Sequence, residues 1–162
     1  MARLADVLTV GGYFGFQANW SSRCDLVAAM SLDEFFTFLE QEEIPGAVER
    51  LAVQAAIADD YGLELAVYEG GQHLRRNSCE GDAVKSEAID ALFEAANRSP
   101  GMKDLYLEFF TAVEDAGVDL FAHYLNTGAW TSFGRFGARE HLFQSRAEAP
   151  KYDAILTYIE QG

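Results

Sequence analysis

The chain has 162 residues, of which 49% are hydrophobic and 23% are charged, and its formal net charge is −14. These values are typical of one globular domain with a buried core, and the negative charge argues against nucleic acids and anionic membrane surfaces as partners. No apolar stretch approaches the roughly 20 residues needed to span a bilayer, and the N-terminus lacks the apolar core of a signal peptide, although a longer parent protein could be secreted.

The first part of the chain predicts a strand, a long loop and two helices. Residues 4–10 form a short apolar run that suits a buried strand, and the glycine-rich segment 11–15 is typical of a loop. Ser31 and Glu34 have the spacing of a capping box, which predicts a helix start. A second helix is expected over residues 47–61.

The same order of elements repeats twice more. Glycines close two of the predicted helices, Gly62 before the second strand and Gly117 before the third. The expected units cover residues 1–62, 63–117 and 118–162; the later two have strands at 63–68 and 118–124 and helices at 87–96, 103–116 and 151–160.

This alternation predicts an α/β fold with three consecutive parallel β-strand–loop–helix units in a single domain, 1–162. The long loops with polar and aromatic residues all follow strands, whereas the tight glycine joints precede them. Ligands of parallel sheets bind beyond the carboxyl ends of the strands, so this asymmetry predicts one functional face.

Glu69 is the leading candidate for chemistry, because it directly follows an apolar strand and precedes two glycines. A carboxylate at the rim of the sheet supplies half of the pair that glycoside hydrolysis requires. The alternative reading, a loop carboxylate paired with Arg75 or Arg76, stays open at this point. His73, four residues later, is expected either to contact the ligand and Glu69 or to stabilise the loop.

Aromatic residues gather at or after the predicted strand ends, where their faces could stack on sugar rings. Amides nearby, such as those of Gln17, Asn19 and Asn126, could bind sugar hydroxyls. Each aromatic residue taken alone fits core or loop packing better than a ligand site, and only the convergence of several favours a sugar. The residues expected to bind substrate are Tyr13, Trp20, Tyr68, His73, Asn126 and Trp130.

Neither a metal site nor a cofactor site is predicted. The three histidines are spread over three units and do not form a zinc pattern. The glycines of segment 11–15 lack the spacing of a phosphate-binding loop, so no cofactor is expected. Cys24 and Cys79 lie in loops after different strands; free thiols are expected, and a disulfide between the loops is the alternative.

The chain resembles bacterial glycoside hydrolase-like or cellulose-binding (β/α)8-barrel proteins. The string Tyr68-Glu69-Gly70-Gly71-Gln72-His73-Leu74 carries most of the resemblance, which extends to segments 5–15, 97–106, 130–137 and 150–154. It implies that the three units are the last three of a barrel. It also implies that Glu69 is in the position of the nucleophile of retaining enzymes, and that the acid/base residue lies outside this chain.

Together, the residue patterns and this resemblance lead us to expect a carbohydrate-active protein that resembles the C-terminal part of a retaining glycoside hydrolase acting on β-linked polysaccharide. It is expected to be inactive alone, with a missing N-terminal barrel half or a second copy of the chain as its polypeptide partner. Two alternatives remain: a non-catalytic carbohydrate (cellulose)-binding module, and a half-barrel that self-associates to cover unpaired strand edges.

Overall fold

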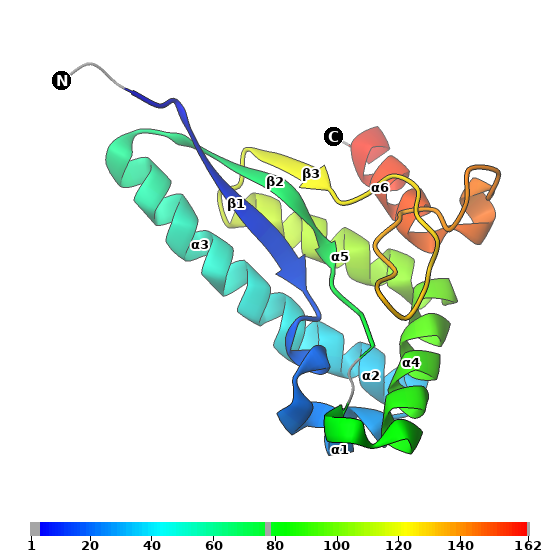
Figure 1. Cartoon of the computed structure of the whole chain (residues 1–162). Helices are drawn as coiled ribbons and strands as arrows, with labels where there is room; N and C mark the ends of the chain where they lie inside the picture. The colour runs from blue at the N-terminus through cyan, green and yellow to red at the C-terminus, as the bar shows by residue number, and fades with distance from the viewer. Residues whose placement is uncertain (1–3, 77–78, 162) are drawn as a thin grey trace.

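The computed structural model describes residues 4–76 and 79–161, and it is built on one sheet of three parallel strands (Figure 1). The strands are β1 (Val7–Phe14), β2 (Glu64–Gln72) and β3 (Leu120–His123). Their order in the sheet is β1-β2-β3, and both pairings are parallel. The predicted α/β architecture with three consecutive parallel strands is therefore confirmed.

Two strands run further than the sequence predicts. We expected β1 to end before Gly11 and β2 to end before Glu69, but the strands continue to Phe14 and Gln72. Glu69 therefore lies inside β2 instead of following it. The register between β1 and β2 shifts at this point, because Val10 pairs with Val67 and Gly11 pairs with Glu69, so that Tyr68 is the extra residue of a β-bulge.

Close packing explains the glycines that looked like loop residues. An ideal Cβ added to Gly70 would overlap the carbonyl oxygen of Gly12 and would lie 2.5 Å from Phe121 Cζ. Glycine within a strand often marks such a close approach of another backbone or ring. These glycines therefore fit the sheet and do not end it.

Five of the six α-helices in the described residues lie close to their expected positions, whereas the short helix Cys24–Ala28 lies in a segment expected to be a loop. Ser31 caps α2 as predicted: its hydroxyl accepts from Glu34 N at 3.3 Å, and Glu34 Oε2 accepts from Ser31 N at 2.8 Å. Gly62 ends α3 in the left-handed conformation, with φ of 62°. The helices are α1 (Cys24–Ala28), α2 (Leu32–Phe38), α3 (Ile44–Tyr61), α4 (Ala83–Arg98), α5 (Gly101–Asp115) and α6 (Pro150–Gln161), with a π-helical turn at Leu39–Glu43 and short 3-10 turns at Gln17–Asn19, Ser21–Arg23, Cys79–Gly81 and Arg146–Glu148.

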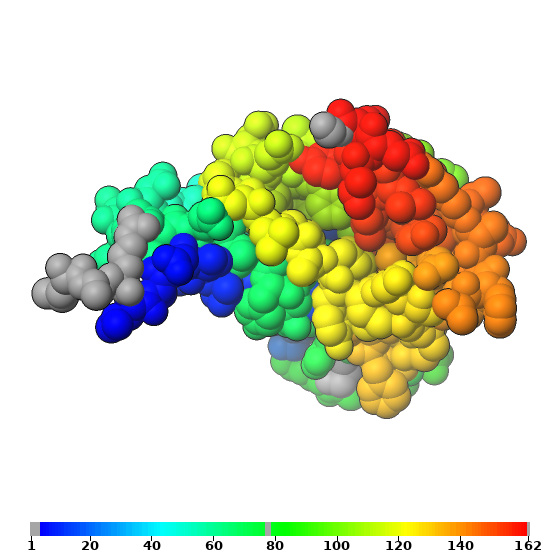
Figure 2. All heavy atoms as spheres, turned by 90° about the horizontal axis from the view of Figure 1, so that it is seen from above, coloured from blue at the N-terminus to red at the C-terminus, as the bar shows by residue number. Residues whose placement is uncertain are grey.

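The sheet is covered by helices on one face. Val67, Phe14 and Phe109 are fully buried in the core between the strands and helices such as α5. Side chains that point the other way are open: Tyr68 is 60% exposed and Leu120 is 64% exposed. Figure 2 shows atoms of β1, β2 and β3 as a continuous part of the visible surface.

A disulfide joins Cys24 on α1 to Cys79 in the segment between β2 and α4, with a Cα–Cα distance of 5.7 Å. The expectation of free thiols is therefore wrong. The bridge connects the loop after β1 to the loop after β2, and both cysteines are nearly inaccessible to solvent. The two loops that frame the functional end of the sheet are covalently held together.

Candidate functional site

The candidate site lies at the carboxyl end of the sheet, around Tyr13 and Glu69. Gly11 and Glu69 are partners in the register, so the Glu69 side chain shares the uncovered face with Tyr13, two residues along β1. The Tyr13 phenol lies close enough to the Glu69 carboxylate for that group to affect its pKa. Partial burial raises the pKa of the Tyr13 phenol above its usual range, and the neighbouring negative charge of Glu69 raises it further. The Tyr13 phenol is therefore protonated at neutral pH.

His73 packs against the same tyrosine in a small aromatic cluster. Its ring contacts Tyr13 edge-on at 5.4 Å between centroids, Phe16 at 4.7 Å and Phe136 at 5.3 Å. Burial lowers the pKa of His73, and the positive charge of Arg75 acts in the same direction, while Glu69 opposes them. The neutral imidazole is thus favoured in this cluster.

Asn19 fastens the loop after β1 to the segment after β2. Its Nδ2 donates to the backbone oxygen of His73 at 2.5 Å, and its Oδ1 accepts from Arg75 N at 3.1 Å. The same Nδ2 lies 3.4 Å from His73 Nδ1. The amide that the sequence suggested as a sugar ligand therefore holds the position of His73.

Two cavities meet at Tyr13. The first, of about 610 Å³, runs along the free edge of β1 and is lined by Tyr13, Tyr68 and residues of α3 that include Arg50. The second, of about 500 Å³, lies in front of the loop after β1 and is lined by Gly11, Tyr13, Phe16, Gln17, Trp20 and Arg50. Both have the size of small-ligand pockets. Tyr13, Trp20 and Tyr68 are therefore brought to one continuous region.

Two of the residues predicted to bind substrate lie elsewhere. Trp130 is only 6% exposed, its Nε1 donates to the Gly137 oxygen at 2.8 Å, and Lys151 Nζ lies 4.4 Å from its ring centroid. No open face remains for a sugar ring. Asn126 is exposed, but its side chain accepts from Arg139 Nη2 at 3.1 Å and so stabilises the last long loop.

A buried polar network supports the site from beneath. Gln72 N donates to the Tyr106 hydroxyl at 2.9 Å, and that hydroxyl lies 3.2 Å from His123 Nε2. Gln72 Nε2 and Lys151 Nζ both donate to the backbone oxygen of Arg135. Because Arg135 belongs to the loop that also carries Phe136, this network ties the end of β2 to the aromatic cluster.

Sequence reasoning missed Phe16 and the network. Phe16 was missed because β1 was expected to end earlier, which placed Phe16 inside a long loop with no assigned structure. The longer strand brings it beside His73.

Within the described ranges, no three His, Cys, Asp or Glu side chains gather in a way that could hold a metal ion. In the same ranges, no helix has the length and apolar character needed to cross a membrane.

Comparison of the chain with known protein families, with characterised proteins and with solved structures finds no match. The functional argument therefore depends on the geometry of the site alone.

Proposed function

We propose that this chain forms one half of a carbohydrate-active site, in which Glu69 faces the anomeric carbon of a β-linked sugar. The observation that supports the proposal most is the position of Glu69 on the uncovered face of the sheet, beside the Tyr13 phenol whose pKa it raises and next to two cavities. A phenol beside a carboxylate can donate to one of its oxygens and leave the other free for substrate.

The proposed chemistry is that of a retaining glycosidase. Glu69 would attack the sugar, and a second carboxyl group about 5–5.5 Å away would protonate the leaving group. Neither cavity at Tyr13 has an Asp or Glu among its lining residues, so Glu69 lies beside the cavities and not in their lining, and no second carboxyl group faces it there. We therefore assign the acid to a polypeptide segment outside this chain, and the isolated chain is expected to bind sugar without hydrolysing it.

The finer fold proposal, three closing units of a (β/α)8 barrel, is consistent with consecutive neighbouring strands and helices packed on one face. Cavities lie beside both edge strands, the one at β1 described above and another of about 510 Å³ that includes Phe121 of β3. The cavity beside β3 is a place where a flanking unit of a barrel would pack.

Binding is tested by affinity electrophoresis in soluble β-glucans. Tyr68→Ala removes an exposed ring from the first cavity and should weaken retardation roughly tenfold, the usual contribution of one aromatic contact. Tyr61→Ala is the matched control, since Tyr61 is 74% exposed at the far end of α3. Equal retardation of both variants and the parent chain would refute the sugar-binding site.

Catalysis is tested separately with aryl β-glycosides. Turnover by the isolated chain that disappears in Glu69→Gln would overturn the assignment of the acid to another segment. If a longer protein that contains this chain binds glycans but never cleaves them, the alternative of a non-catalytic carbohydrate-binding module replaces the hydrolase. The other alternative, a self-associating half-barrel, predicts a dimer in sedimentation because β1 and β3 have free edges.

A further inference from the structure

We propose that the cavity in front of the loop after β1 binds an anionic sugar residue, a ring that bears a carboxylate or a sulfate group. The proposal rests on the carbohydrate-binding function above and adds the class of sugar. Its basis is the lining of the cavity, which combines two exposed aromatic rings, one arginine and one amide.

The aromatic part suits a sugar ring. Trp20 is 47% exposed and Phe16 is 48% exposed, although both are large apolar side chains. Phe16 is held in place by its ring contact with His73. An aromatic face that is fixed in a pocket and open to solvent provides a surface on which the apolar face of a pyranose can stack.

The polar part suits an anion. Arg50 extends from the exposed side of α3, and its Nη2 donates a hydrogen bond to the backbone oxygen of Tyr13 at 3.5 Å. An ideal Cβ on Gly46 would lie 3.6 Å from Arg50 Nη1 and 3.7 Å from Gln17 Nε2. Two side-chain nitrogen donors therefore lie close to the same backbone position, where glycine has no side chain. A guanidinium beside an amide donor can bind a planar carboxylate or a sulfate through several hydrogen bonds.

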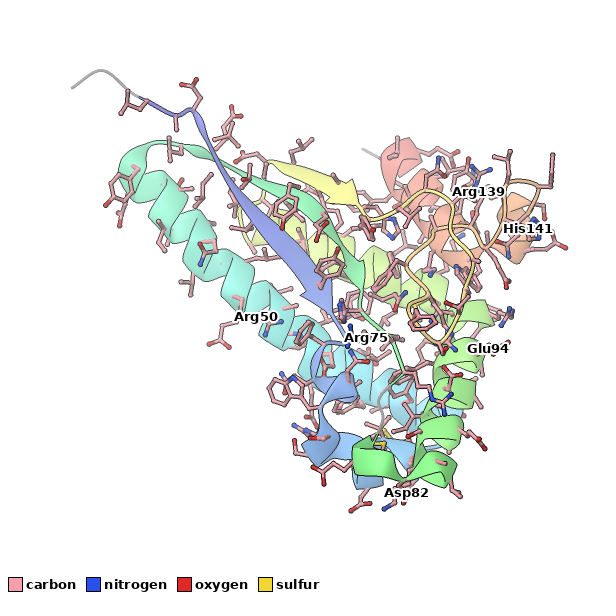
Figure 3. All side chains as sticks on the ribbon, viewed as in Figure 1. Arg50, Arg75, Asp82, Glu94, Arg139 and His141 are labelled. Atoms are coloured by element: carbon pink, nitrogen blue, oxygen red, sulfur yellow. A yellow bond between two sulfur atoms is a disulfide. The ribbon has the colours of Figure 1, made fainter. Side chains whose placement is uncertain are left out.

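The charge around Arg50 is unusual for this chain. The protein carries 26 acidic residues and a net charge of −14, yet no acidic residue lines the cavity. Among residues 4–76 and 79–161, no carboxylate lies within 4.0 Å of the guanidinium of Arg50 or of Arg75. Figure 3 shows these two arginines at the same end of the sheet, Arg50 on α3 and Arg75 after β2.

The positive charge of Arg50 acts on the carboxyl group of Glu43. Glu43 is 1% exposed; its Oε2 accepts from Gln17 N at 3.2 Å, and its Oε1 has no hydrogen-bond partner among the described residues. Burial raises the pKa of this carboxyl group. The hydrogen bond of the Glu43 carboxylate is thus made to the backbone and not to Arg50, whose donors other than the one to the Tyr13 backbone oxygen are open to a ligand in the cavity.

The experiment measures calorimetric affinities of the whole chain for oligouronates, sulfated oligosaccharides and neutral β-gluco-oligosaccharides of equal length. We expect at least one anionic series to bind at least tenfold more tightly than the neutral one. Arg50→Gln should remove that advantage while neutral binding persists, and Trp20→Ala should weaken both kinds of ligand. Lys85→Gln, which changes the net charge equally but lies outside the cavity, should have no effect.

The outcomes separate the two proposals. Tighter binding of the neutral series, or an anionic advantage that survives Arg50→Gln, overturns the inference and leaves the carbohydrate site standing. Absence of binding to every glycan overturns both. Inorganic sulfate or acetate that binds as tightly as the oligosaccharides overturns the assignment to a sugar. Equal losses in Arg50→Gln and Lys85→Gln would show attraction by overall charge, which also overturns it. If the oligouronates bind more tightly than the neutral series, the recognised group is a carboxylate; if the sulfated oligosaccharides do, it is a sulfate.

Discussion

The disulfide between Cys24 and Cys79 is expected to be a major contributor to stability. The two cysteines are 55 residues apart in sequence. In the chain-entropy treatment, cross-linking a loop of this length removes about 4 kcal/mol of conformational entropy from the unfolded state at 25 °C. For a domain whose total stability is about 5–15 kcal/mol, that is a substantial part.

The perturbation is reduction of the bridge or the double replacement Cys24→Ala and Cys79→Ala, and the assay is urea unfolding. Alanine is preferred to serine because both positions are buried, and a buried hydroxyl would add its own cost. We expect the unfolding free energy of the oxidised chain to fall by about 3–4 kcal/mol on reduction. Reductant should leave the double variant unchanged, which controls for effects on other groups.

Two results would refute this reasoning. Mass spectrometry that finds two free thiols in the chain purified without reductant would remove its premise. An unfolding free energy that is the same with and without reductant would show that the bridge does not constrain the unfolded chain. A change in glycan affinity without a change in stability would instead assign the bridge to the positioning of the two loops.

Three further predictions concern buried positions. In urea unfolding, Gly70→Ala should lower the unfolding free energy by about 2–3 kcal/mol, because the added Cβ would overlap its neighbours. Gly11→Ala is the control and should be nearly neutral, because its Cβ would meet nothing closer than 3.9 Å. Burial lowers the pKa of His123 to about 3, whereas a histidine in the unfolded chain has a pKa of about 6.5. The unfolded chain therefore binds the proton first, and stability should fall as pH drops below about 6.5. In NMR spectra, the His123 ring should not titrate between about pH 8 and about pH 5. Because burial raises the pKa of Glu43, ionising this residue costs stability as pH rises above about 4.3. The stability of Glu43→Gln relative to the parent should therefore rise between acid and neutral pH, and a relative stability that falls over this range would contradict the reasoning.

Local patterns in the sequence predicted the parallel order of the strands and the approximate positions of five α-helices, but not α1. The capping residue Ser31 and the helix-ending Gly62 act through contacts within a few residues, so their signals are readable without tertiary structure. The same holds for the apolar runs of β1 and β2. Placement of Tyr13, Trp20 and Tyr68 around one region followed from the rule that loops after parallel strands meet at one edge.

The remaining features depend on contacts between distant residues. Gly70 reads as a loop residue until Phe121, 51 positions away, is known to pack against it. Trp130 reads as a sugar platform until Lys151 is found on its ring. The pairing of Cys24 with Cys79 likewise requires the relative position of two loops, which cysteine spacing alone does not supply.

The free edge of β1 has a consequence for amide exchange. Along a strand paired on one side only, successive N–H groups alternate between the neighbouring strand and the solvent. Deuterium uptake in β1 should therefore alternate from residue to residue, slow where the amide faces β2 and fast where it points outward. A polypeptide that adds a strand to this edge would slow the fast set and leave the other set as it was, which gives a residue-level signature of such a partner.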